Sequence, residues 1–201
     1  LDALQGELSA SHRFVLDELM RHIEEIEARI SRFDARLLEG LESERDTLAL
    51  MQTIPGIDQI GAAMLLVEIG ADMDDFGSAD RLASWVGVCP GNNESAGKRK
   101  SGHTRKGNPY VRRLLCEFAH AASRTTSMFK SKFQALVVRR GYKRAIIAIG
   151  HKMLRTLFFM LKRREHYRDC ATDYEALSVQ RNAPRWIKAL TRFGFITPAS
   201  A

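Results

Sequence analysis

The first fifty residues carry apolar side chains at a helical spacing. After Ile23 the steps between them are three, four, three and four residues, which is the heptad seam that winds two helices together. This pattern predicts a helical hairpin or a coiled coil between copies of the chain. One long amphipathic helix packed on its own domain is the alternative. The seam consists of Leu19, Ile23, Ile26, Ile30, Phe33 and Leu37.

The segment 53–70 has the pattern of a helix-hairpin-helix-like motif. Gly56 permits a tight turn, and the small Ala62 lets two helices approach closely. Backbone N–H groups at the start of the second helix could then bind a phosphate. Asp58 stands where a second glycine is usual, so it could instead cap the second helix and leave the turn a structural role.

Capping residues predict two further helices. Ser78 begins a short helix over 79–86, and Asn108-Pro109 is typical of an N-cap followed by proline in the first turn. The helix after Asn108 has one apolar face. That face is expected to hold Tyr110, Leu114, Leu115, Phe118 and Ala122.

The C-terminal part is also predicted to be helical. Helices are expected over 128–140, where Gly141 ends the helix, and over 143–164. Two short helices are expected near 173–180 and 184–193. The longest of these helices has a core stripe of Ile146, Ile147, Met153, Leu154, Leu157, Phe158 and Leu161. Because no strand with a period of two is evident, the predicted fold class is all-α.

Residues 87–108 interrupt every periodicity. This loop holds five glycines and five lysines or arginines, which suits contact with phosphate, and a loop of this length in a compact domain is usually functional. It lacks the Walker pattern of phosphate-binding loops. Taken alone, Ser95 in this loop is simply a turn hydroxyl. Asp72, Asp74 and Asp75 suggest a metal site or, as we prefer, a solvated acidic loop.

Charge is divided unevenly along the chain. Residues 1–80 carry a net charge of −12, whereas residues 81–201 carry +19. A basic excess of this size predicts a polyanionic partner such as nucleic acid, with a solvated basic face as the alternative.

The cysteines and the N-terminal residues give information about the cellular compartment of the protein. Three widely spaced cysteines form no CxxC pair, which favours buried thiols in a reducing cytoplasm over a zinc site or disulfides. No signal peptide or membrane-spanning run is evident. Since the first residue is Leu1, we expect the chain to be a fragment or a processed product.

Three blocks of sequence resemble the C-terminal transposase domain of the insertion-sequence 110 family. They read TIPGI at 53–57, ASWVGVCP at 83–90, and ESAGK at 94–98 leading to KGNPYVRRLL at 106–115. The resemblance spans roughly residues 50–165, and the preceding helical segment is similar to the coiled coil of that family. It implies an oligomerisation segment over 1–50 and a transposase domain over 51–201, which contains the hairpin motif and the serine loop.

The resemblance implies a DNA strand-exchange enzyme guided by an RNA. Members of the family cut and rejoin DNA with a serine that matches Ser95, and they carry a magnesium-binding RNase-H-like domain that is not evident in these residues. The isolated chain is therefore expected to hold no cofactor and to be inactive in recombination, while Mg²⁺ is expected in the full-length protein. DNA, a guide RNA and a dimer or tetramer of the chain are the expected partners.

The residues expected to contact nucleic acid are mostly basic. Positive charge near the serine could stabilise the phosphorane, and His103 could shuttle a proton or be merely exposed. The magnesium of the intact protein could instead activate Ser95. The expected contacts are Gly56, Lys98, Arg99, Lys100, His103, Arg105, Lys106, Arg112 and Arg113.

Three functions are compatible with the sequence. The first is a serine recombinase domain, the second a module that only binds nucleic acid, and the third an oligomerisation fragment. Ser95→Ala separates the first two, because only an enzyme would lose covalent attachment to DNA while binding survives. Self-association of residues 1–50 alone would support the third.

Overall fold

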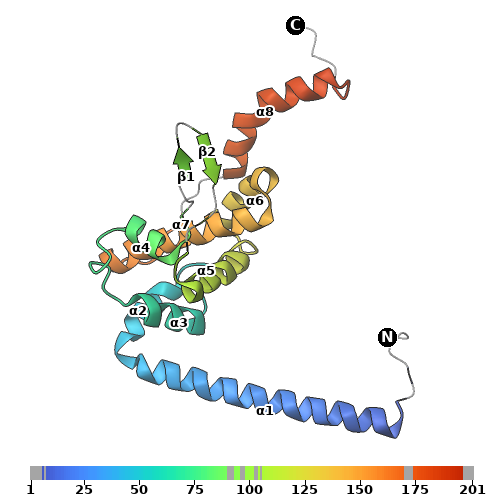
Figure 1. Ribbon diagram of the computed structural model, residues 1–201, viewed down its shortest axis with the longest axis vertical. Helices are drawn as coiled ribbons and strands as arrows, with labels where there is room; N and C mark the ends of the chain where they lie inside the picture. Colours follow the sequence, from blue (N-terminus) through green and yellow to red (C-terminus); the bar gives the residue numbers. More distant parts are fainter. Residues whose placement is uncertain are drawn as a thin grey trace. The chain divides into compact units, whose positions relative to one another are not determined.

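The computed structural model describes residues 6, 8–89, 93–95, 98–101, 104, 106–169 and 174–196. The chain divides into two compact units, Leu1–Ser43 and Glu44–Ala201. Helices form nearly all of the regular structure in the described residues (Figure 1), and the predicted all-α fold class is confirmed.

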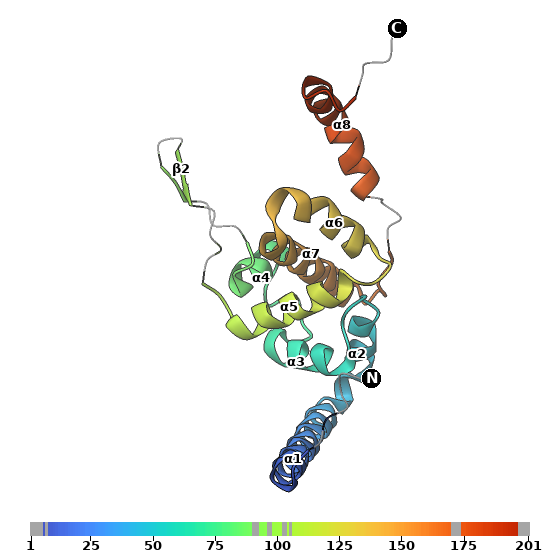
Figure 2. The same cartoon turned by 90° about the vertical axis from the view of Figure 1, so that its right-hand side faces the viewer.

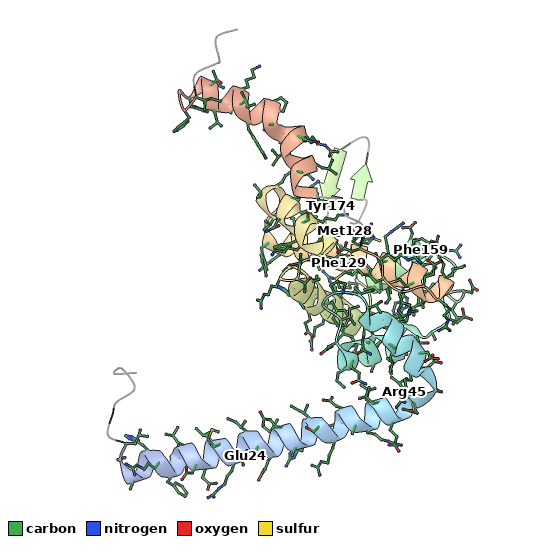
Figure 3. The ribbon with its side chains drawn as sticks, turned by 180° about the vertical axis from the view of Figure 1, so that it is seen from behind. Glu24, Arg45, Met128, Phe129, Phe159 and Tyr174 are labelled. Carbon is green, nitrogen blue, oxygen red and sulfur yellow. The ribbon has the colours of Figure 1, made fainter. Side chains whose placement is uncertain are left out.

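In the first unit, α1 (Ala10–Gly40) is one continuous helix, so no helical hairpin forms within it. Ser9 caps it, because its hydroxyl oxygen accepts a hydrogen bond from the N–H of His12 at 3.2 Å. None of its residues, all of which the structure describes, is buried, and side chains project from the helix along its length (Figure 3). The seam is therefore open: Ile26 is 40% exposed and Phe33 is 76% exposed. Self-association through this seam stays a prediction.

The second unit is built around α7, which packs against four other helices. Figure 2 shows α7 among its neighbours. The predicted helices over 79–86 and 128–140 are confirmed, and the one over 143–164 is confirmed to within one residue. A 3₁₀-helix, η2 (Glu42–Glu44), follows α1. The α-helices of the unit are α2 (Arg45–Gln52), α3 (Gln59–Ile69), α4 (Ala79–Val86), α5 (Pro109–Ala122), α6 (Met128–Arg140), α7 (Tyr142–Arg163) and α8 (Tyr174–Arg192).

The core of the second unit forms where α5 crosses α7. The predicted stripe of α7 is buried except for Ile147, which is half-buried. A Cβ atom on Gly150 would lie 3.1 Å from the carbonyl oxygen of Leu115, so the two helices approach closely there. The predicted face of α5 is buried apart from Tyr110, which is 65% exposed. That prediction was wrong because Val111 occupies the buried position of the first turn, rotating the stripe by one residue.

The two short helices predicted near the C-terminus are a single helix, α8. Pro184 lies inside it. Proline removes one backbone donor and usually breaks a helix, which is why the sequence indicated a boundary there. Among the elements that the structure describes, α8 packs only against α6, where the ammonium of Lys132 lies 5.2 Å from the ring centroid of Tyr174.

The segment after α7 is held against α2 and α6 by hydrogen bonds. A guanidinium nitrogen of Arg164 donates a hydrogen bond at 2.8 Å to the hydroxyl of Thr47, which is buried in α2. The backbone N–H of Tyr167 donates to the hydroxyl oxygen of Thr53 at 3.0 Å. The carboxylate of Asp169 then accepts from the N–H of Met128 at the start of α6. These residues therefore connect α2, α6 and α7.

Candidate functional site

The two limbs of the 87–108 loop are anchored side by side at the end of α4. Gly87 ends α4 in the left-handed conformation with φ of 76°. Val88 is buried, and its N–H donates to the carbonyl oxygen of Ala83 at 3.2 Å. On the returning limb, the N–H of Asn108 donates to the carbonyl oxygen of Trp85 at 3.2 Å. The loop therefore leaves the helical body and returns to it at one place.

Gly107 lies directly against the backbone of α4. A Cβ atom at this position would be 2.3 Å from the carbonyl carbon of Val86 and 2.4 Å from the nitrogen of Gly87. Real Cβ atoms do not come that close to backbone atoms, so only glycine fits between the loop and α4. This contact fixes the returning limb one residue before α5 begins.

Asn108 is the predicted N-cap of α5, and the structure confirms it. Its side-chain oxygen accepts from the N–H groups of Tyr110 at 2.9 Å and Val111 at 3.1 Å. Its side-chain nitrogen donates to a carboxylate oxygen of Glu68 in α3 at 2.7 Å. Sequence reasoning missed Glu68, because a single glutamate on a helix normally indicates a solvated face.

Within the loop, the described backbone forms a small antiparallel hairpin of β1 (Asn93–Ser95) and β2 (Lys98–Ser101), visible in Figures 1 and 2. Ser95 pairs with Lys98, and Glu94 pairs with Arg99. The hairpin was not predicted, because its strands are short and carry no alternating apolar residues. It brings the backbone of the predicted nucleophile next to that of Lys98, Arg99 and Lys100.

The other predicted basic contacts are distributed between the loop and α5. Lys106 and Arg113 are exposed. Arg112 is half-buried, and its guanidinium donates to the hydroxyl oxygen of Thr104 at 2.8 Å, so it holds the returning limb of the loop. His103 and Arg105 lie outside the described residues.

Gly56 packs against α5. It has φ of 91°, and a Cβ atom there would lie 2.6 Å from the nitrogen of Ala122. The side-chain oxygen of Asp58 accepts from the N–H of Gly61 at 2.9 Å, so the capping role considered for Asp58 is confirmed. An open groove of about 450 Å³ adjoins the turn, with Asp58 and Glu117 among its lining residues. Two carboxylates there disfavour a phosphate and support a packing role for the turn.

Acidic residues of the loop before α4 and of the first turn of α4 pair with the basic side of α7. The ammonium of Lys162 lies 2.7 Å from a carboxylate oxygen of Asp74, and Arg155 forms an ion pair with Asp80. Within the described residues, no group of three His, Cys, Asp or Glu side chains is arranged to hold a metal ion. Both pairs are exposed to solvent, so they hold Lys162 and Arg155 only weakly.

Two titratable side chains near the core have shifted pKa values. Burial raises the pKa of the Cys116 thiol, partly offset by Arg112. Burial also lowers the pKa of His151, and the nearby charge of Arg155 lowers it further. Cys116 and Cys89 are free thiols and are half-buried rather than fully buried, while Cys170 lies outside the described residues.

Comparison with known proteins gives a consistent set of relatives. Residues 48–134 match the model of the family described as "Transposase IS116/IS110/IS902 family". Over 84% of the chain and 48% of the relative, the sequence is 28% identical to a "Probable family 20 transposase" of Pseudomonas aeruginosa. It is also 28% identical to the "Transposase for insertion sequence element IS1111A" of Coxiella burnetii, over 65% of the chain and 37% of the relative.

A third relative is the "Insertion element IS900 uncharacterized 42 kDa protein" of Mycobacterium paratuberculosis, which is 28% identical over 81% of the chain and 41% of its own length. The chain thus spans about half or less of the length of each of these relatives. In the described residues, no helix combines the length and the apolar character that a bilayer crossing requires. The family match, which includes the whole 87–108 loop, and the similarity to named transposases together support a relationship to the Transposase IS116/IS110/IS902 family.

Proposed function

We propose that the chain is the C-terminal part of a transposase of this family, and that Ser95 is the nucleophile that cuts and rejoins DNA. The observation that carries the proposal is the family match over 48–134, because the matched segment contains Ser95 and both anchored limbs of its loop. The relatives named as transposases support the same activity.

The proposed reaction is a reversible transfer of a phosphodiester to serine. The Ser95 oxygen attacks the phosphorus of the DNA backbone and forms a phosphoserine bond, while the bond from phosphorus to the sugar oxygen breaks. The proton lost from the hydroxyl ends on that leaving sugar oxygen. A sugar hydroxyl of another strand then attacks the phosphoserine and regenerates Ser95. Since one ester bond replaces another at each step, strands can be exchanged without ATP.

Positive charge in β2 suits the charge that develops during this reaction. The strand carries Lys98, Arg99 and Lys100 in sequence, and its backbone pairs with the strand that holds Ser95. Cations aimed at a transferring phosphoryl group stabilise its transition state. We propose that these residues, with Lys106 and Arg113 at the base of the loop, hold the phosphates on either side of the scissile bond.

The proposal also includes Mg²⁺, a guide RNA and further copies of the chain. Mg²⁺ is expected in the full-length protein, and within the described residues no group of three His, Cys, Asp or Glu side chains is arranged to hold it, so the reaction is written with the residues of this chain alone. A guide RNA and assembly of several copies are part of the proposal, because exchange of two duplexes requires more than one nucleophile. The open seam of α1 supports the assembly.

The decisive test traps the protein–DNA adduct. The full-length protein that contains this chain is incubated with its RNA and its end and target DNA, denatured, and mapped by mass spectrometry. We expect the adduct on Ser95, and we expect Ser95→Ala to abolish it while DNA binding changes by no more than about fivefold, since one hydroxyl contact is worth only ~1 kcal/mol.

Two serines serve as matched controls for this test. Ser84 lies on α4 and Ser101 in β2, and alanine variants of both should retain most of the activity. An adduct on Ser101, or full activity of Ser95→Ala, would refute the assignment. Retained binding with no adduct on any residue would favour a module that only binds nucleic acid.

A further inference from the structure

Within the described residues, the Ser95 hairpin has few contacts with the helical body. Among the elements that the structure describes, β1 and β2 pack only against each other. The direction in which the hairpin points is therefore set by its two limbs. The outgoing limb is held by the buried Val88, and the returning limb is held at Thr104, Gly107 and Asn108.

Asn108 joins three helices at the foot of the returning limb. Its side-chain oxygen caps α5, its backbone N–H bonds to Trp85 of α4, and its side-chain nitrogen bonds to Glu68 of α3. The cap orients α5, and the backbone bond places the limb against α4. The bond to Glu68 ties this point to α3, which also packs against α5.

Glu68 lies at a position where a carboxylate without a partner is unfavourable. It lies in the last turn of α3, at the negative end of the helix dipole, where an acidic side chain is slightly destabilising. Within the described part of the chain, its one side-chain hydrogen bond is to Asn108, and it forms no ion pair there. Its placement is explained by the bond to Asn108.

We propose that Glu68 is a positioning residue for Ser95, and that its hydrogen bond to Asn108 fixes the returning limb of the serine hairpin for strand exchange. This inference rests on the proposed function. Glu68 itself touches neither the DNA nor the nucleophile. It acts through Asn108, and a misplacement of about 1 Å at a reacting group can slow a reaction roughly a hundredfold.

Exchanging the amide of Asn108 and the carboxylate of Glu68 tests whether their bond positions the hairpin or only stabilises the fold. In Asn108→Asp the retained oxygen still caps α5, but the donor to Glu68 becomes a second carboxylate oxygen, which repels it. Glu68→Gln keeps an acceptor for Asn108. The double variant Glu68→Gln/Asn108→Asp restores the bond with its direction reversed, because the glutamine amide donates to the aspartate. Glu68→Ala removes the acceptor and leaves the cap of α5 untouched.

The first measurement is the rate of adduct formation by the full-length protein at saturating DNA. We expect a loss of about tenfold or more in Asn108→Asp and Glu68→Ala, a rate near that of the wild type in Glu68→Gln, and recovery to within about threefold in the double variant. The dissociation constant for DNA should change by less than about threefold throughout. A wild-type rate in both Asn108→Asp and Glu68→Ala, or no recovery in the double variant, would overturn the proposal.

The second measurement does not depend on formation of the protein–DNA adduct. Amide hydrogen exchange over 93–101 should quicken in Asn108→Asp and Glu68→Ala and return to the wild-type rate in the double variant, while exchange in α7 stays unchanged. Unchanged exchange in the hairpin of both single variants would also overturn the proposal. Ser95→Ala is assayed in parallel: if it still forms the adduct, the proposed function fails, while the exchange data still decide whether Glu68 holds the hairpin.

Discussion

Replacing Gly56 by alanine tests whether the turn between α2 and α3 serves packing or phosphate binding. Gly56 has φ of 91°, and a Cβ atom would lie 2.6 Å from the nitrogen of Ala122 and 2.7 Å from the carbonyl oxygen of Phe118. The backbone conformation costs an alanine about 1–3 kcal/mol. Overlap with backbone atoms, which cannot rotate away, adds roughly 1–3 kcal/mol. We therefore expect Gly56→Ala to lower the free energy of unfolding by about 2–6 kcal/mol.

Gly70→Ala is the matched control for the conformational part of this cost. Gly70 has φ of 72°, and nothing lies within 4 Å of its Cβ position. Urea unfolding followed by the fluorescence of Trp85, in a Trp186→Phe background, measures both variants. Gly56→Ala should be less stable than Gly70→Ala by about 1–3 kcal/mol. Equal losses would refute the contact argument, and a stable Gly56→Ala that no longer binds DNA would point to phosphate binding.

If the basic half neutralises five to eight phosphates, the affinity for duplex DNA should fall roughly 10³-fold or more between about 50 and 200 mM salt; a flat dependence would exclude an electrostatic interface. Ile26→Asp places a charge in the α1 seam and should abolish self-association in sedimentation runs, so an unchanged mass would show that the seam joins no copies. Because burial raises the pKa of Cys116, its thiol should be alkylated at pH 8 more slowly than a small free thiol and should react faster in urea; equal rates in both conditions would contradict that burial.

Local signals in the sequence were sufficient for most helix boundaries. Ser78 and Asn108-Pro109 mark helix starts because a capping side chain bonds to N–H groups only two or three residues away. Gly141 likewise ends α6 through its own positive φ. These effects need no knowledge of the rest of the fold. Pro184 is the exception, because α8 continues past a residue that usually stops a helix.

Contacts between distant segments could not be predicted in the same way. Gly56 permits a turn by its own nature, but its packing role depends on α5, which lies far along the chain. Glu68 meets Asn108 only because α3 and α5 are neighbours in space. The candidate nucleophile was found through its resemblance to a family, since a loop serine has no pattern of its own. The residues that orient its loop required the structure.

The hydrogen bond between Arg164 and Thr47 has a consequence for the order in which the domain is made. Its partners are 117 residues apart. At a usual rate of synthesis, Thr47 is therefore made roughly six to twenty seconds before Arg164. Until then the buried hydroxyl of Thr47 in α2 lacks this donor. A nascent chain that is released before Arg164 is made therefore lacks the hydrogen bond that connects α2 to the end of α7.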